Sequence, residues 1–272
     1  MSFDYEKSIW GKGMAGLKWS NPTSFRLRQA LSALAKLPAG AKVLELGCGA
    51  GQFIRAIKKI RPELDCYGCD ISQNALDAAK QAGDGVNYQL SAEKILPYEN
   101  NFFDAALIFD VLEHVEDPDA VLAEINRTLK PGGVFYCFVP CEGDRLSLWY
   151  WVKKLARDKK HELTKKYAGH INYFSRRSLF ALFKKHNFSV ARARYSEHLL
   201  GQILGVMVFM AMDRAVRKQK IIQINNETYF AKTKQSTPTQ FLKDIVNTLV
   251  YLESVIFSKI PSPNAHLTAV KK

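Results

Sequence analysis

The stretch Lys42-Val-Leu-Glu-Leu-Gly-Cys-Gly-Ala-Gly51 decides the fold. It begins with a short apolar run that is typical of a buried strand, and three glycines then follow in G-x-G-x-G spacing. Glycine is needed there because the backbone must turn sharply and come close to a ligand. Residues 52–60 continue with apolar side chains at helical intervals. The stretch therefore predicts a strand, a ligand-binding turn and a helix.

The same alternation of strand and helix continues along the first half of the chain. Apolar or alternating runs predict further strands at residues 65–70, 86–90, 104–109 and 134–139, and helices are predicted at 73–82 and 118–129. Strands that alternate with helices of about ten residues indicate an α/β fold with a doubly wound parallel sheet. Sheets of this kind bind ligands at the carboxyl ends of their strands.

An acidic residue at the end of the second strand narrows the class of ligand. Asp70 follows Gly51 by 19 residues, and a carboxylate at that place can accept both hydroxyls of a ribose. Three details disfavour a nicotinamide dinucleotide. The glycine spacing is not G-x-G-x-x-G, and Glu45 would repel a pyrophosphate but suits a cation. The third detail is that the fourth strand ends in Asp110-Val-Leu-Glu-His-Val115.

Together with Leu129-Lys-Pro-Gly-Gly133, these motifs resemble those of class I S-adenosylmethionine-dependent methyltransferases over about residues 40–140, in the same order and spacing. The resemblance implies a Rossmann-like, seven-stranded, mostly parallel sheet with an antiparallel last strand. It also implies S-adenosyl-L-methionine as the cofactor. This cofactor carries a sulfonium and an α-amino group, so an acidic, glycine-lined cleft suits it electrostatically.

The resemblance further implies which residues bind the cofactor. Asp70 would bind the ribose and Ile71 would pack on the adenine, whereas Asp110 and Val111 would close the cofactor on the side below the substrate. Many relatives have Asp where this chain has Ser91. The other cofactor-binding residues that the resemblance implies are Glu45, Gly47, Cys48, Gly49, Gly51, Gln52, Ala92 and Glu93.

Two segments outside this region are similar to those of ubiquinone-biosynthesis O-methyltransferases. Trp19-Ser-Asn-Pro22 precedes the glycine turn at the expected distance, followed by Arg26 and Arg28. The resemblance implies that one of these arginines, which we expect to be Arg28, contacts the cofactor carboxylate; a solvated helix arginine is the alternative. The segment Gly169-His-Ile-Asn-Tyr-Phe-Ser175 implies a loop over the substrate.

Transfer of a methyl group to oxygen requires that the acceptor lose a proton, and a phenol has a pKa of about 10. Histidine suits the role of base, and the candidates are His114 and His170. Tyr173 is placed to orient the substrate. The alternative for His114 is a residue that holds the start of a helix, and the alternative for His170 is a structural role in its loop.

The sequence therefore predicts a methyltransferase that acts on the oxygen of a small phenolic or lipid-like acceptor. The alternatives are methylation of carbon or nitrogen in another small metabolite, and a non-catalytic protein that binds the cofactor and a membrane or protein partner. Nucleic acid is not expected, because residues 110–113 lack the Asp/Asn-Pro-Pro-aromatic run of enzymes that methylate bases. No metal site is expected, because Cys66 and Cys69 would point to opposite faces of one strand.

The charge of the 272-residue chain is uneven. Its net charge is +13, yet residues 1–142 carry 15 basic and 18 acidic side chains, whereas residues 143–220 carry 18 basic and 5 acidic ones. A basic region suggests an anionic partner. Residues 145–157 predict a basic amphipathic helix with tryptophans, which is typical of a membrane interface. Its apolar face is expected at residues 148, 151, 152 and 155, and a lid helix over the substrate is the alternative.

The chain divides into three expected parts. They are an N-terminal helical cap (1–40), the cofactor-binding domain (41–196 plus 264–272) and a helical insertion (197–263). In the insertion, the apolar run 199–212 is shorter than the roughly 20 residues of a membrane span. It and a helix at 241–260 are expected to pack on each other, form a homodimer or contact lipid. Few cysteines and no apolar leader predict a cytoplasmic location, and the basic helix and the insertion predict a membrane-peripheral one.

Overall fold

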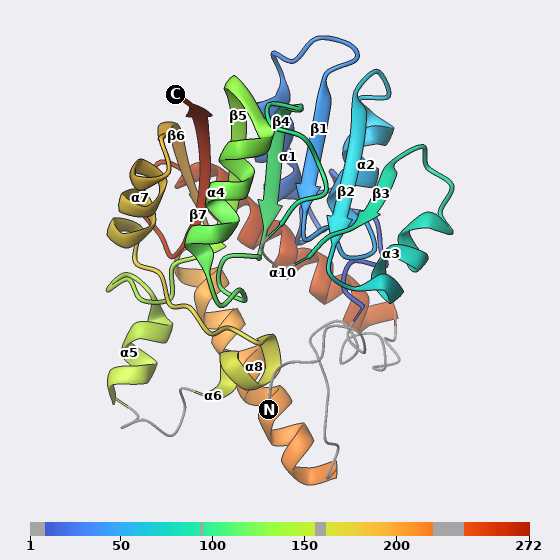
Figure 1. The fold of residues 1–272 in the computed structure, drawn as a ribbon. Coiled ribbons are helices and arrows are strands. Elements are labelled where there is room, and N and C mark those ends of the chain that lie inside the picture. Colours follow the sequence, from blue (N-terminus) through green and yellow to red (C-terminus); the bar gives the residue numbers. More distant parts are fainter. Residues whose placement is uncertain (1–8, 93–94, 156–161, 220–236) are drawn as a thin grey trace.

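A seven-stranded sheet forms the centre of the computed structural model, which describes residues 9–92, 95–155, 162–219 and 237–272. The strand order is β3-β2-β1-β4-β5-β7-β6 (Figure 1). Only β7 runs antiparallel to its neighbours β5 and β6, so the predicted fold is confirmed. The strands are β1 (Lys42–Leu46), β2 (Asp65–Asp70), β3 (Asn87–Leu90), β4 (Phe103–Phe109), β5 (Leu129–Pro140), β6 (Phe188–Ser196) and β7 (Asn264–Lys271).

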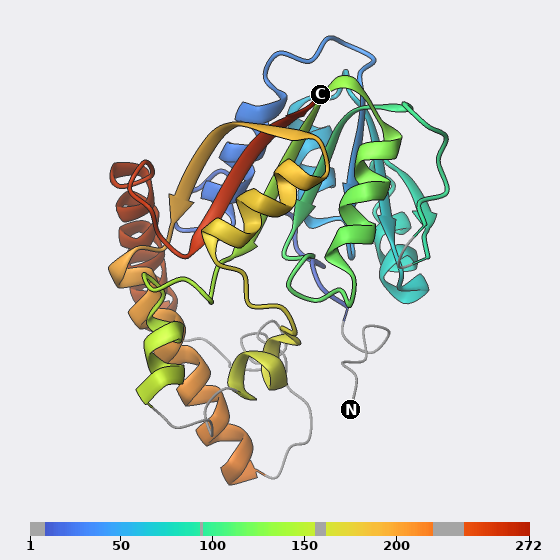
Figure 2. The same cartoon turned by 60° about the vertical axis from the view of Figure 1, so that its left-hand side comes forward.

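Helices cover both faces of the sheet (Figure 2). Apolar residues of α1 and α2 belong to the cluster on one face, and those of α4 and α7 to the cluster on the other. The helices are α1 (Ser24–Leu34), α2 (Gln52–Ile60), α3 (Gln73–Lys80), α4 (Pro118–Thr128), α5 (Leu148–Leu155), α6 (Glu162–Ala168), α7 (Arg176–Lys185), α8 (Leu199–Gln219) and α10 (Thr237–Ile256). Within the first half of the chain, these bounds confirm the predicted strand–helix alternation to within a few residues.

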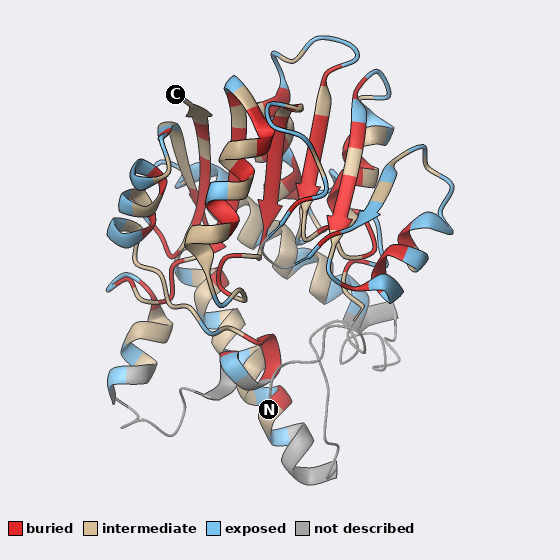
Figure 3. Cartoon of the chain, in the orientation of Figure 1, coloured by how far each residue is buried: buried red, intermediate tan, exposed pale blue. Residues whose placement is uncertain are grey.

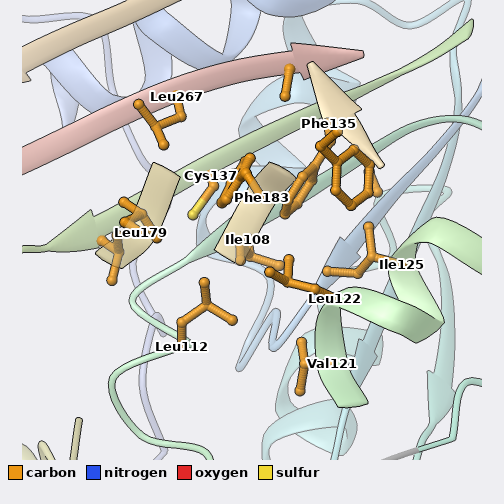
Figure 4. Packing of buried hydrophobic residues seen from close by; sticks show 14 of the residues in the cluster. Ile108, Leu112, Val121, Leu122, Ile125, Phe135, Cys137, Leu179, Phe183 and Leu267 are labelled. Carbon is orange, nitrogen blue, oxygen red and sulfur yellow. The ribbon is translucent and has the colours of Figure 1, made fainter. Parts of the chain in front are cut away.

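The core lies against β4 and β5, whose side chains are buried on both faces (Figure 3). Ile108 of β4 packs near Leu122 and Ile125 of α4, and Phe183 of α7 stacks on Phe135 of β5 with their ring centroids 5.2 Å apart (Figure 4). Burial of each such side chain contributes roughly 1.5–3 kcal/mol. A strand segment that is buried on both faces is apolar, which is why β4 is a continuous hydrophobic run from Ala105 to Phe109.

Side-chain caps hold the starts of two of these helices. The Ala75 backbone N–H donates to Ser72 Oγ at the start of α3 (3.1 Å). The Ala120 backbone N–H donates to Asp117 Oδ1 at the start of α4 (3.0 Å), and Pro118 occupies the first turn, where a missing N–H costs nothing. These local interactions fix where each crossover helix begins, and with it the loops at the carboxyl ends of the strands.

Helices α5, α6 and α8 lie beyond the carboxyl ends of the strands (Figures 1 and 2). The apolar run at 199–212 is the first two thirds of α8, which continues as a helix to Gln219. Helix α10 contacts α1 and β6, and it meets α8 near its own carboxyl end. In the described part of the chain, no helix is both long and apolar enough to cross a membrane.

The face that α5 turns inward differs from the prediction. Trp149 packs edge-on against Phe209 of α8 with their ring centroids 5.4 Å apart, whereas Trp151 is 43% exposed. The predicted apolar face included residue 151 and omitted 149. Three aromatic residues are consecutive at positions 149–151, so helical spacing alone can place either tryptophan on the apolar face. Only the position of α8 decides that Trp149 is the one that packs inward.

The cysteines have the role of small apolar side chains. All five are free and buried. Cys66 and Cys69 belong to the clusters on opposite faces of the sheet, as their spacing in β2 predicts. They therefore cannot form a metal site together.

Candidate functional site

A cavity of about 760 Å³ lies at the carboxyl ends of β1, β2, β4 and β5. Its wall combines the glycine turn after β1 with residues from the ends of the other strands. Helices α8 and α10, the loop at residue 170 and the segments at Trp10, Arg26 and Trp149 also contribute to it. The cavity is thus placed where doubly wound sheets bind their ligands.

The glycine turn has the backbone that only glycine adopts without strain. Gly47, Gly49 and Gly51 have φ of 71°, 53° and 84°. A Cβ at Gly49 would lie 2.7 Å from the carbonyl oxygen of Trp10, which also accepts a hydrogen bond from the Ala50 backbone N–H (2.8 Å). The segment at Trp10 and Gly11 therefore lies directly on the turn, and both residues line the cavity.

Glu45 holds the turn in place from below. Its Oε2 accepts a hydrogen bond from the Ile54 backbone N–H in the first turn of α2 (2.7 Å), and its side chain is buried. Burial raises the pKa of Glu45 well above its usual value. Glu45 also forms part of the cavity wall, as do Cys48 and Gln52. The carboxylate thus fixes the start of α2 relative to β1.

Asp70 connects the second strand to the glycine turn. Its Oδ2 accepts a hydrogen bond from the Gly49 backbone N–H (2.8 Å), and its Oδ1 accepts one from the Ser72 backbone N–H (2.9 Å). Asp70, Ile71 and Ala92 line the cavity, and the Ile71 side chain is 46% exposed. The structure therefore brings these predicted residues together. Glu93, predicted beside Ala92, lies outside the described residues.

Arg26, rather than Arg28, reaches the cavity. Its Nη1 lies 2.5 Å from Asp110 Oδ2, and its guanidinium lies over the ring of Phe138, 3.9 Å from the centroid. Arg28 is exposed, donates from Nη2 to the carbonyl of Leu17 (3.0 Å) and is not part of the cavity wall. The structure therefore places Arg26, and not the predicted Arg28, in the cavity wall. Residues two apart on a helix point about 200° apart, so only one of them can face the site.

Asp110 is held in an unusual backbone conformation, with φ of 52°. Its backbone N–H donates to the carbonyl of Phe138 on β5 (3.2 Å), and its carboxylate is paired with Arg26. Val111 follows and lies against Gly47, where an added Cβ would be 2.6 Å from Val111 Cγ2. Both residues line the cavity next to the glycine turn, as the sequence predicts.

His114 and His170 meet in the structure, although 56 residues separate them. Their rings lie edge to face with centroids 5.0 Å apart, and both line the cavity. Burial, and then the neighbouring His170, lower the pKa of His114 from 6.5 to about 4. A group with so low a pKa takes a proton from a phenol only at high cost, which makes His114 the weaker candidate for a base.

His170 is paired with a carboxylate that the sequence analysis did not identify. Its Nδ1 lies 2.8 Å from Glu142 Oε1, and Thr164 Oγ1 donates to Glu142 Oε2 (3.2 Å). Because an ionised carboxylate only accepts, this contact places the imidazole proton on Nδ1 and leaves Nε2 as the basic nitrogen. The Tyr173 hydroxyl donates to the carbonyl of His170 (3.3 Å), so Tyr173 holds the loop.

The loop that carries His170 is tied to the end of β4. The backbone N–H groups of Ile171 and Asn172 both donate to the carbonyl of Glu113 (2.8 and 3.0 Å). Asn172 Nδ2 donates to the carbonyls of Leu112 and Val115 (2.9 and 2.6 Å). These bonds are why a histidine distant in sequence lies beside His114.

Three residues of this region also form a group with the ligand chemistry of a metal site. One ligand atom from each of Glu113, His114 and His170 lies within 4.8 Å of the others. Glu113 is fully buried, and among the described residues neither of its carboxylate oxygens has a hydrogen-bond partner. Burial raises the pKa of Glu113 well above its usual value. The sequence analysis, which considered only cysteines as ligands, did not identify this group.

Comparison with known proteins defines the class. Residues 23–193 match the protein family described as a methyltransferase domain, and the chain belongs to this family. Its fold and family are those of the class I S-adenosylmethionine-dependent methyltransferases, with S-adenosylmethionine as the cofactor.

Two curated relatives and one solved structure show how far the similarity extends. The chain is 36% identical over 114 residues to a ubiquinone/menaquinone biosynthesis C-methyltransferase of Desulfotalea psychrophila, covering 41% of this chain and 46% of the relative. It is 35% identical over 121 residues to a ubiquinone biosynthesis O-methyltransferase of Methylococcus capsulatus, covering 43% and 48%. The chain thus spans about half the length of these relatives. A putative sarcosine dimethylglycine methyltransferase from Galdieria sulphuraria shares the fold, with a TM-score of 0.58, 16% identity and coverage of 92% and 85%.

The residues at the turn fit this cofactor. The glycines allow the turn to pack closely against its surroundings, because an added Cβ at each would come within 2.7 Å of a neighbouring atom. Gly47 and Gly49 lie in the cavity wall beside the carboxylate of Asp70, which suits a ribose.

Proposed function

We propose that the protein transfers a methyl group from S-adenosylmethionine to the oxygen of a small phenolic or lipid-like acceptor. The observation that carries the proposal is the contact of His170 Nδ1 with Glu142 Oε1 (2.8 Å) in the wall of the cavity that also contains the glycine turn. A histidine oriented by a carboxylate is an effective base, because the carboxylate fixes the tautomer and stabilises the imidazolium that forms.

In the proposed reaction, Nε2 of His170 takes the proton from the acceptor hydroxyl. Glu142 keeps its position at Nδ1 and balances the positive charge of the imidazolium. When bound, the cofactor supplies an electrophilic methyl group on a sulfonium. The Arg26–Asp110 pair and Val111 shape the floor between the two ligands. Much of the rate enhancement in such a displacement comes from holding the reacting atoms in line.

The acceptor side of the cavity supports an apolar substrate. Trp149, Leu204, Val208 and Phe209 line it opposite the glycine turn. A pocket with an apolar wall and a few polar groups at one end is suited to an amphiphilic small molecule. This supports a phenolic or lipid-like acceptor over a small, highly polar metabolite.

A methyl-transfer assay with His170→Ala tests the proposal. We expect kcat with labelled cofactor and a phenolic extract to fall by about 10²–10⁴-fold, the usual contribution of a general base. Cofactor affinity by calorimetry should remain that of the wild type. Unchanged turnover would reject His170 as the base, and label found on carbon or nitrogen of the product would favour the alternative reactions. Cofactor binding without transfer to any fraction would favour a non-catalytic role.

We also propose that the protein attaches to anionic membrane surfaces through the outer sides of α8 and α10. Exposed apolar residues recur on these helices at spacings of four and seven: Leu199, Ile203 and Met207 on α8, and Leu242, Leu249 and Ile256 on α10. The net charge of +13 favours an anionic surface. A second copy of the chain is the alternative partner for these faces.

Vesicle flotation distinguishes a membrane from a second copy of the chain as the partner. We expect the protein to float with phosphatidylserine vesicles at low salt, and the variant Leu242→Asp with Leu249→Asp to remain at the bottom. Ile60→Asp, which changes an exposed apolar residue of α2, is the matched control and should float. If the wild type does not float, and if it sediments as a dimer that the double variant abolishes, the partner of these faces is a second copy of the chain and not a membrane.

A further inference from the structure

The cavity extends well past the glycine turn, into the space between α8 and α10. On α8 the residues that face it are Gly201, Leu204, Gly205, Val208 and Phe209, and on α10 they include Val246 and Val250. These positions follow the spacing of three and four that defines one face of a helix. On α8 the exposed apolar residues Leu199, Ile203 and Met207 lie on the opposite side of the helix. Helix α8 therefore has a separate inner face that belongs to the cavity, whereas on α10 the exposed Leu242 and Leu249 lie next to that face.

The two glycines of α8 on this inner face, Gly201 and Gly205, differ in the space that surrounds them. A Cβ at Gly201 would lie 2.7 Å from Glu197 Cβ and 3.3 Å from Val250 Cγ1, so close packing requires glycine there. A Cβ at Gly205 would meet no atom within 4 Å. Glycine in the interior of a helix is unfavourable relative to alanine, and at Gly205 packing within the described residues gives no reason for it. The absence of a side chain at Gly205 therefore leaves open space in the cavity wall.

The space beside Gly205 is bordered mainly by apolar side chains. Leu204, Val208 and Phe209 border it on α8, and Val246 and Val250 on α10. Each polar residue that α8 and α10 contribute to these walls has a partner, and these residues are Gln202, Lys243 and Asn247. Gln202 Oε1 accepts from the Leu148 backbone N–H (2.6 Å), and Asn247 Nδ2 donates to the carbonyl of Ser20 (2.8 Å). The region thus offers dispersion contacts and few free polar atoms.

We propose that this space is a subsite for an apolar chain carried by the acceptor, and that Gly205 sets how large a chain it takes. The proposal rests on the proposed function, since it names the part of the acceptor that lies away from His170. From Gly201 to Phe209 the helix rises about 12 Å, at 1.5 Å per residue. The wall is therefore long enough to contact a chain of several carbon atoms. Its head group lies at the polar end, near His170 and Asp110.

Binding of paired ligands tests the subsite independently of methyl transfer. Phenol and para-octylphenol would be titrated into the protein saturated with S-adenosylhomocysteine, with binding followed by tryptophan fluorescence. We expect the wild type to bind para-octylphenol at least tenfold more tightly than phenol, because each fully buried methylene is worth up to about fourfold. We expect Gly205→Leu to abolish this preference and to leave the affinity for phenol within a factor of about three. Gly205→Ala, the matched control, should retain most of the preference.

Two outcomes would overturn the subsite: a wild type that does not distinguish the two ligands, or a folded Gly205→Leu that keeps the full preference. Should Gly205→Leu not fold, Val246→Phe fills the same space from α10 and must give the same loss. Methyl transfer to both ligands is measured separately. A chain preference without any transfer would retain the subsite and reject the proposed O-methylation of phenols, whereas transfer without a chain preference would do the reverse.

Discussion

The glycine turn gives the sharpest test of how the cofactor site is built, through Gly49→Ala. Gly49 has φ of 53°, and a left-handed conformation costs a residue with a Cβ about 1–2 kcal/mol. The new Cβ would also lie 2.7 Å from the carbonyl oxygen of Trp10, which is backbone and cannot rotate away. Relieving that contact breaks the hydrogen bond from Ala50 to Trp10, worth about 1 kcal/mol.

These effects add to about 2–3 kcal/mol. If the cofactor requires the intact turn with Trp10 on it, cofactor affinity falls by roughly 30- to 150-fold, at about 1.4 kcal/mol per factor of ten. Gly132→Ala is the matched control, because Gly132 has φ of 75° and a Cβ there would meet nothing within 4 Å. It carries the backbone strain without the contact and lies outside the cavity wall.

Calorimetry with S-adenosylhomocysteine measures the affinity, and urea unfolding measures the stability of both variants. We expect Gly132→Ala to lose stability alone, and Gly49→Ala to lose stability and cofactor affinity. If both variants bind the cofactor like the wild type, the close approach of Trp10 to the turn has no part in binding and the reasoning fails.

Three further predictions concern the histidines and the core. His114→Gln should reduce the loss of stability on acidification. The pKa of His114 is about 4 in the folded protein and 6.5 in the unfolded chain, so the unfolded chain binds more protons between these values and wild-type stability falls by about 3 kcal/mol as the pH drops through them. Urea midpoints of wild type and variant that change in parallel from pH 7 to 4 would contradict this. Glu142→Gln should lower kcat by about 10–100-fold with KM little changed and shift its pH profile, because Nδ1 of His170 loses its anionic partner; an unchanged profile would mean that Glu142 only supports the loop. Phe183→Ala should destabilise the fold by about 3–5 kcal/mol in urea unfolding, since Phe183 is fully buried against Phe135; a loss under 1 kcal/mol would show that the core closes over the gap.

Local sequence patterns were sufficient for the sheet and for the cofactor end of the site. Strand β4 is a continuous apolar run from Ala105 to Phe109 because this part is buried on both faces. The glycines after β1 are required by backbone angles that no other residue adopts easily. Asp70 could be placed because it is the last residue of its strand. In each case the residue and the reason for it lie within a few positions of each other in the chain.

The acceptor end could not be predicted in the same way. Glu142 and His170 are 28 residues apart, and only the bonds between the His170 loop and the end of β4 bring the loop to its place. Arg26 and Arg28 are equivalent in sequence, and the direction in which α1 presents them decides that Arg26 faces Asp110. The position of Glu142, two residues past the carboxyl end of β5, was the available signal for it, because that end borders the ligand site.

The central claim is that S-adenosylmethionine binds at the glycine turn with its ribose held by Asp70. Calorimetric titration of the cofactor into wild type, Asp70→Ala and Asp65→Ala tests it, since Asp65 is an exposed acid at the opposite end of the same strand. The account predicts binding to the wild type and to Asp65→Ala, and a loss of at least tenfold in affinity for Asp70→Ala. Equal affinity of all three proteins, or binding of a nicotinamide dinucleotide in place of S-adenosylmethionine, would contradict it.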